Sequence, residues 1–198
     1  MTTLGLKGAL VHGHTNGVYL ANRENWAIFE RAEALGVPLY LHPTTPHVVG
    51  AFFPHDPNLA IGWGFQAETA TYFVQLMFSG VFDAYTRLKI LLGHLSEMPP
   101  FLYERLDDFT AVLAEQKGLQ HTNKNYMKEN LLVTTSGNFS TPAFLCTQLS
   151  LGVENILFAT DFPMESMDRA VSFLHNLPIS DMDREKVAHL NAERLLHL

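Results

Sequence analysis

The sequence predicts an α/β fold built on a parallel β-sheet. Short apolar runs alternate with longer segments in which apolar residues recur at helical spacing, the pattern of successive strand–helix units. Three of the apolar runs end on a reactive side chain, namely His42, His94 and Asp161. Because the carboxyl ends of parallel strands in a barrel open onto one face, these side chains are expected to converge. Two imidazoles and a carboxylate suit a divalent metal with a proton-transfer partner.

Each element follows from a local pattern. The short apolar runs predict strands at residues 8–11, 38–42, 89–93, 131–135 and 156–160. The first helical pattern carries Trp26 and Phe29 on one face and is stopped by Gly36 and Pro38, whereas Ser180 can cap the last helix. Helices are expected at 25–35, 65–86, 100–117, 124–129, 142–151, 165–174 and from 180 onward. The irregular run 43–64 is expected to be a functional loop.

The count of five strands leaves two architectures open. An eight-stranded βα barrel typically needs about 250 residues, and this chain has 198. The chain is therefore either a smaller open α/β sheet or the larger part of a barrel without its first strands. With 47% hydrophobic residues it can bury one core, so residues 1–198 are expected to form one domain.

Composition and charge exclude several classes of partner. The net charge of −7 provides no basic footprint for nucleic acid and no polybasic membrane patch. No apolar run approaches the ~20 residues that span a bilayer, and the first residues do not resemble a signal peptide. Cys146 is the only cysteine, so no internal disulfide is possible and a reducing compartment, the cytoplasm, is expected.

Several motifs follow one another along the chain in a fixed order. They are Leu-His42-Pro, Leu-Gly-His94-Leu-Ser-Glu97, Thr-Thr-Ser-Gly-Asn138-Phe and Phe-Ala-Thr-Asp161-Phe-Pro-Met-Glu165. In this order the motifs resemble the decarboxylase branch of the amidohydrolase superfamily, the γ-resorcylate, 2,3-dihydroxybenzoate and related hydroxybenzoate decarboxylases. The segments around Tyr19, Trp63 and Asn191 support the resemblance, which runs from Leu4 to Leu198.

The resemblance implies a fold and a role for each motif. It implies a TIM barrel of which this chain holds strands 4 to 8, and one divalent metal ion, zinc, manganese or magnesium. His42 and Asp161 would be metal ligands, and His94 the acid/base histidine, oriented by Glu97 and by Asp161. Arg105 would help to hold the substrate carboxylate. In some relatives this arginine reaches across a subunit interface, so a homo-oligomer is expected if the full barrel is present.

The chemistry implied is removal of CO₂ from an ortho-hydroxybenzoate without a redox cofactor. The substrate would be a small aromatic carboxylic acid whose phenolic oxygen and carboxylate chelate the metal. Asp161, or His94 as its relay, would protonate the ring carbon before the C–C bond breaks.

One departure from the family pattern concerns the metal ligands. The family's first strand supplies a Glu-x-His pair that has no counterpart in this sequence. His12 and His14 also follow an apolar strand, but the interval from His14 to His42 allows only one βα unit. The spacing therefore argues against His12 and His14 as that ligand pair.

Alternative interpretations remain open. Asp161 could be an ordinary helix N-cap, and Arg105 could form a surface ion pair with its acidic neighbours on a helix. A metal-dependent hydrolase of the same superfamily, acting on an ester, lactone or amide, uses a similar ligand set. A non-catalytic fragment or degenerate homologue is the third alternative, because a partial barrel exposes two unpaired strand edges.

Overall fold

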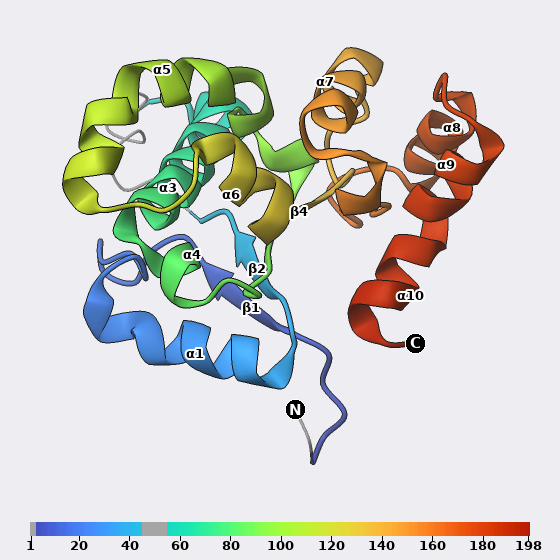
Figure 1. Cartoon of the computed structure of the whole chain (residues 1–198). Coiled ribbons are helices and arrows are strands. Elements are labelled where there is room, and N and C mark those ends of the chain that lie inside the picture. The colour runs from blue at the N-terminus through green and yellow to red at the C-terminus, as the bar shows by residue number, and fades with distance from the viewer. Residues whose placement is uncertain (1–2, 45–54) are drawn as a thin grey trace.

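The structure, a computed structural model, describes residues 3–44 and 55–198. Its strands form one parallel sheet whose spatial order follows the chain (Figure 1). The strands are β1 Ala9–His12, β2 Leu39–His42, β3 Ile90–Leu92, β4 Leu131–Thr134 and β5 Ile156–Leu157. The predicted parallel direction and order are therefore confirmed, and so are the approximate positions, except that β5 ends at Leu157 and not at residue 160.

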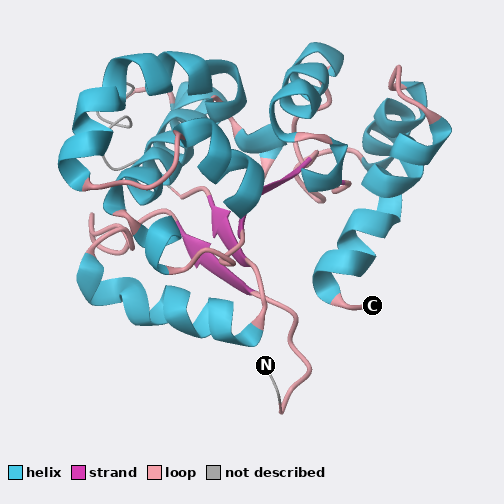
Figure 2. Ribbon diagram, in the orientation of Figure 1, coloured by secondary structure: helices cyan, strands magenta, loops and turns pink. Residues whose placement is uncertain are grey.

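Helices surround the sheet and connect its strands (Figure 2). The α-helices are α1 Trp26–Leu35, α2 Pro57–Leu59, α3 Phe65–Ser79, α4 Val81–Ala84, α5 Pro99–Lys117, α6 Asn123–Asn130, α7 Thr141–Leu151, α8 Met167–Asn176, α9 Asp181–Glu185 and α10 Asn191–Leu196. Shorter helical turns are η1 Arg23–Asn25, η3 Ala60–Gly64, η4 His94–Ser96, η5 Val153–Asn155 and η6 Lys186–Leu190. In the described residues, no helix has the length and apolarity that crossing a membrane requires.

Two of the predicted segments differ most clearly from the structure. The helix expected at 65–86 divides into α3 and α4 at Gly80, whose φ of 83° does not fit a right-handed helix. The loop expected at 43–64 is helical from residue 57 onward, where α2 and η3 lead directly into α3. Residues 45–54 of that loop lie outside the described residues.

The outer face of the sheet packs against the helices. Leu39 and Leu41 of β2 and Ile90 and Leu92 of β3 are at most 2% exposed. They belong to a core that includes the aromatic rings of α1 and α3. Burial of this apolar surface is the main force that holds the helices against the sheet.

The inner face is different, because the side chains that alternate with the buried ones are more open. Leu10, Tyr40 and Leu91 lie side by side in the strand register, and Leu10 is 55% exposed. The strand order has no switch point, which is the order of a βα barrel and not of a doubly wound sheet. The arrangement is therefore that of part of a TIM barrel, and the inner row ends at His12 and His42.

Candidate active site

His42 is the last residue of β2, and its side chain is exposed at the carboxyl end of the sheet. Its Nδ1 lies 2.7 Å from the carbonyl oxygen of Pro43. When Nδ1–H donates to that carbonyl, Nε2 carries the lone pair. A backbone carbonyl that fixes the tautomer in this way is a common feature of metal-binding histidines.

His94 begins a tight turn directly after β3. His94, Leu95, Ser96 and Glu97 all have positive φ, between 52° and 69°. This left-handed turn brings the Glu97 side chain, which is 1% exposed, within 2.6 Å of His94 Nδ1. Glu97 therefore fixes the orientation of the His94 ring.

Asp161 lies on the other side of the His94 ring, four residues beyond β5. Its Oδ2 is 3.9 Å from His94 Nε2, and its side chain is 32% exposed. His94 thus stands between two carboxylates, one buried and one open to solvent. The structure thus brings His94, Glu97 and Asp161 together, whereas His42 ends the neighbouring strand and makes none of these contacts.

Glu97 and Asp161 change the pKa of His94. Burial alone would lower the pKa of His94, but the hydrogen bond and charge of Glu97, with a contribution from Asp161, raise it above its ordinary value. Burial also raises the pKa of Glu97, against the effect of His94. The pair is therefore suited to hold a proton close to Asp161.

The loop after β4 supports this centre, and the sequence reasoning gave its residues no role. Gly137 packs so closely that a Cβ there would lie 2.7 Å from His94 Cδ2 and 2.8 Å from Asp161 Oδ2. Asn138 Nδ2 donates to the carbonyl oxygen of His94, at 3.2 Å. Thr135 Oγ1 donates to the Ala159 carbonyl and accepts from its N–H. The loop therefore connects the strand ends that carry His94 and Asp161.

Arg105 is not brought to this centre. It is exposed on α5, where its guanidinium lies over the Phe109 ring at 4.6 Å from the centroid. Within the described residues it forms no ion pair, so the alternative of a surface salt bridge with its acidic neighbours is not observed either.

The donor atoms for a metal are spread over the strand ends. Among the described residues, no group of three or more His, Cys, Asp or Glu side chains is close enough together to hold a metal ion. The exposed imidazole of His42 and the partly exposed carboxylate of Asp161 have the donor chemistry for a divalent ion. The His12 ring lies beside His42, at 5.5 Å between centroids, whereas His14 turns toward Glu68 and Tyr19.

Comparison with known proteins gives this geometry a family. The family model Amidohydro_2, described as amidohydrolase, matches residues 1–198. The chain belongs to this amidohydrolase family. It is 38% identical to γ-resorcylate decarboxylase of Polaromonas sp. (strain JS666 / ATCC BAA-500) over 98% of its length, and 35% identical to that of Rhizobium radiobacter over 98%. In both alignments this chain covers 63% of the relative.

Solved structures of similar proteins have the same fold. The 5-carboxyvanillate decarboxylase LigW from Sphingomonas paucimobilis matches all of this chain with a TM-score of 0.91 at 37% identity, over 60% of its own length. A 2,6-dihydroxybenzoate decarboxylase in complex with 2,6-dihydroxybenzoate matches 99% of this chain at 34% identity, with a TM-score of 0.91 and 64% of its own length covered. A dihydroxybenzoic acid decarboxylase from Polaromonas sp. JS666, with bound manganese and the inhibitor 2-nitroresorcinol, scores 0.90 at 37% identity, over 100% of this chain and 62% of its own. This chain thus spans less than two thirds of these relatives, and the resemblance to hydroxybenzoate decarboxylases is confirmed.

Proposed function

We propose that this chain carries the proton-transfer side of a metal-dependent, non-oxidative decarboxylase for an ortho-hydroxybenzoate-type acid. The observation that carries the proposal is the His94 ring, held by Glu97 on one nitrogen and facing Asp161 with the other. This arrangement stands at the carboxyl ends of parallel strands, where barrel enzymes build their active sites. The similar decarboxylases support the reaction type.

The proposed metal site uses His42 and Asp161. A divalent ion bound there, zinc, manganese or magnesium, would supply positive charge to the phenolic and carboxylate oxygens of the substrate. The tautomer of His42, with Nδ1 on the Pro43 carbonyl, leaves Nε2 available for it. Manganese in the Polaromonas relative supports a divalent ion.

The proton-transfer step belongs to His94 and Asp161. Because Glu97 occupies Nδ1, the Nε2 atom of His94 is the one that exchanges a proton with Asp161. In the reaction the ring carbon that bears the carboxylate gains a proton from this pair. The bond to the carboxylate then breaks, its electrons return to the ring, and CO₂ leaves. Solvent restores the proton to the pair.

The proposed substrate is a small aromatic acid with a hydroxyl beside its carboxylate. The 2,6-dihydroxybenzoate bound to one solved relative has this chemistry. Arg105, as a cation, would hold the carboxylate or its surroundings. Since Arg105 lies exposed on α5, this role rests on the resemblance to the family and not on a contact in the structure.

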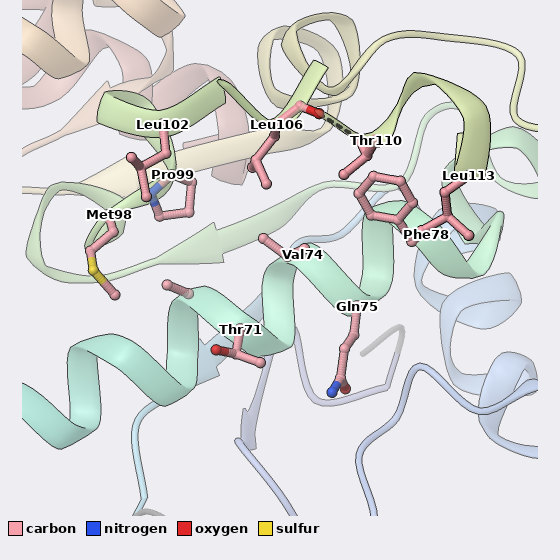
Figure 3. A pocket seen from close by; sticks show the side chains of 11 residues that line it. Thr71, Val74, Gln75, Phe78, Met98, Pro99, Leu102, Leu106, Thr110 and Leu113 are labelled. Atoms are coloured by element: carbon pink, nitrogen blue, oxygen red, sulfur yellow. Dashed lines mark hydrogen bonds between the residues drawn. The ribbon is translucent and has the colours of Figure 1, made fainter. Parts of the chain in front are cut away.

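The surface of α5 supports a homo-oligomer. One side of α5 faces α3 across an apolar groove of about 420 Å³, where Val74 and Phe78 point toward Leu106 and Leu113 (Figure 3). A second side of α5 is also apolar but faces solvent. Phe101, Phe109 and Val112 on that side are 81%, 76% and 67% exposed. An exposed apolar patch of this kind marks an interaction site.

The α5 surface is also self-complementary. Phe101, Arg105, Asp108 and Val112 form a stripe along one side of the helix, with opposite charges at its centre and apolar residues at its ends. Two copies of α5 packed antiparallel about a two-fold axis would place Arg105 opposite Asp108 and Phe101 opposite Val112. The proposed partner is therefore a second copy of the same chain.

The roles of His42 and His94 are separable by experiment. The test uses a chimera. The part of the Polaromonas relative that precedes its match to this chain is joined to the start of this chain. His42→Ala removes a ligand, so bound metal and turnover should both fall. His94→Ala removes a proton carrier, so turnover should fall while the metal stays.

Metal content by elemental analysis and CO₂ release from a hydroxybenzoate panel are the two measurements. Loss of metal in His94→Ala with retention in His42→Ala would reverse the assigned roles. Hydrolysis of esters or lactones, with no CO₂ released from any hydroxybenzoate, would refute the proposed reaction in favour of a hydrolase.

A further inference from the structure

We infer that His12 is a metal ligand that acts together with His42, so that β1 and β2 present a two-imidazole site. The inference deepens the proposed function, because it names an additional ligand at the same metal centre. Its test measures metal binding and does not depend on turnover.

The strand register places the two imidazoles side by side. His12 and His42 are Cα partners in the parallel pairing of β1 with β2, and both are the last residues of their strands. Partner residues on adjacent parallel strands point to the same face, with backbones about 4.8 Å apart. Both side chains are exposed at the carboxyl end, the end that also carries His94 and Asp161.

The separation of the rings matches a shared ion. A zinc–nitrogen bond of about 2.0–2.1 Å at a tetrahedral angle places two ligating imidazoles with their centroids about 5 Å apart. The observed separation is 5.5 Å, with an angle of 80° between the ring planes. The χ2 torsion of histidine is broad, so the ring rotations that aim both nitrogens at one ion cost little.

The nitrogen atoms of the pair are available. His42 has Nδ1 on the Pro43 carbonyl, which leaves Nε2. Within the described residues, the His12 ring contacts the His42 ring, and neither of its nitrogens is hydrogen-bonded. The short spacing between His14 and His42 argues only against His12 as part of the Glu-x-His pair of the family's first strand. It does not exclude His12 as a ligand from β1, the strand that pairs with the strand of His42.

His14 provides the matched control. Its Nδ1 accepts a hydrogen bond from the N–H of Gly17 at 3.2 Å, and its Nε2 lies 3.7 Å from Glu68 Oε1. His14 is thus a second histidine on the same short segment, but its ring is engaged with Glu68 and Tyr19. A general effect of removing a histidine from this segment would appear in both variants.

A second imidazole also predicts which metal is preferred. Nitrogen ligands favour zinc over manganese more strongly than oxygen ligands do. If His12 is a ligand, its removal should weaken zinc binding more than manganese binding. A purely structural role would change the two affinities by the same factor.

The experiment titrates the 198-residue chain, free of any affinity tag, with zinc and with manganese against a competing chelator. His12→Asn and His12→Gln should each weaken zinc binding about tenfold or more, as should His42→Asn. The ratio of zinc to manganese affinity should fall in both His12 variants. His14→Asn and His175→Asn, the latter on the exposed side of α8, should bind zinc like the original chain. Circular dichroism shows that each variant is folded.

The outcomes separate this inference from the proposed function. If His42→Asn weakens zinc binding and both His12 variants do not, the inference is overturned while the proposed metal centre stands. If none of the His12 and His42 variants changes zinc binding, both fail, and if the original chain binds no zinc, the inference is overturned. An equal loss in the His14 and His12 variants would likewise overturn the inference, because it would indicate a general effect on the segment.

Discussion

The turn that carries His94 has a strained backbone, and this conformation makes possible the contact between His94 and Glu97. Four successive residues with side chains have positive φ, and each such residue costs roughly 1–2 kcal/mol relative to ordinary backbone. The turn brings Glu97 under the His94 ring at 2.6 Å, which no regular helix or strand would do from the same two positions. Strain kept at a reactive side chain is typical of functional sites.

Ser96 has the strained backbone conformation of this turn, but its side chain makes no hydrogen bond to a described residue that would offset the cost. Its φ is 69°, it is fully buried, and in the described residues its hydroxyl has no hydrogen-bond partner. Ser96→Gly should therefore raise the free energy of unfolding by about 1 kcal/mol, even after the greater entropy of glycine in the unfolded chain. Urea denaturation with an unchanged m-value measures the gain, and a loss of stability would contradict the strain argument.

Gly137 is required for a different reason, because it is pressed against both reactive side chains. A Cβ at Gly137 would meet His94 Cδ2 at 2.7 Å and Asp161 Oδ2 at 2.8 Å. Gly137→Ala should destabilise the chain by about 1–3 kcal/mol more than a glycine-to-alanine change that introduces only the backbone penalty. Gly36→Ala is the control, since Gly36 has nearly the same φ, 63° against 66°, and nothing within 4 Å of its Cβ position. Equal losses of stability in urea would refute a steric role for Gly137.

At the scale of elements, local patterns predicted the strands and helices better than their ends. β5 stops at Leu157 because Phe158 N–H donates to Val187 and Ala159 N–H donates to the side chain of Thr135. Both acceptors come from elements far away in the sequence. The pattern of residues 156–160 therefore cannot show where the strand ends. The apolar run was sufficient only to predict that a strand is present.

The C-terminal helical segment contains a pH-dependent cluster of its own. His189 lies between Glu185 and Glu193, and hydrogen bonds to Glu185 and then Glu193 raise its pKa above the ordinary value. A raised pKa in the folded state means that the folded chain holds the proton more tightly than the unfolded chain. The stabilisation is therefore complete below the unfolded pKa of about 6.5 and is lost as the pH rises through the folded pKa.

His189→Gln should remove this dependence while keeping the helix propensity of the position. The original chain should melt at a higher temperature than the variant at about pH 5.5, and the difference should shrink by about pH 9. Added salt should reduce the difference, because all three side chains are exposed. A difference in melting temperature that grows with pH would show that the sign is wrong.

For the whole molecule, the sequence predicted which strand ends carry the candidate site residues, but not the contacts that support them. His42, His94 and Asp161 were predictable because each ends an apolar strand, and parallel strands open onto one face. The contacts of Gly137 and Asn138 with the His94 turn were not, because they join a loop to another strand's end without any periodic pattern. The predicted strand order already placed β1 beside β2, and the register adds that His12 is the Cα partner of His42.

The α5 surface predicts how the chain associates. Arg105→Asp or Asp108→Arg alone places like charges opposite each other in an antiparallel pair of α5 helices, and should weaken dimerisation about tenfold or more. The double exchange restores opposite charges and should recover most of the affinity. Leu149→Asp, at an 85% exposed position on α7, is the control for a charge added elsewhere. Sedimentation equilibrium measures the association, and a double variant no better than the single ones would exclude this pairing.

The final prediction concerns the activity of the 198-residue chain assayed by itself. A catalytic divalent site usually takes three protein ligands and keeps one position open. Even with His12 counted beside His42 and Asp161, no three such side chains among the described residues lie close enough together to hold one ion, although His94, Glu97 and Asp161 are in place for proton transfer. Metal held by fewer ligands is bound more weakly by several kcal/mol, so turnover should stay below about one-thousandth of that of an intact relative. CO₂ release is measured with excess zinc, manganese or magnesium and a panel of hydroxybenzoates, with the Polaromonas enzyme as the positive control. Turnover comparable to the control would contradict this expectation, and would require that the remaining ligands come from a second copy or from residues outside the described ranges.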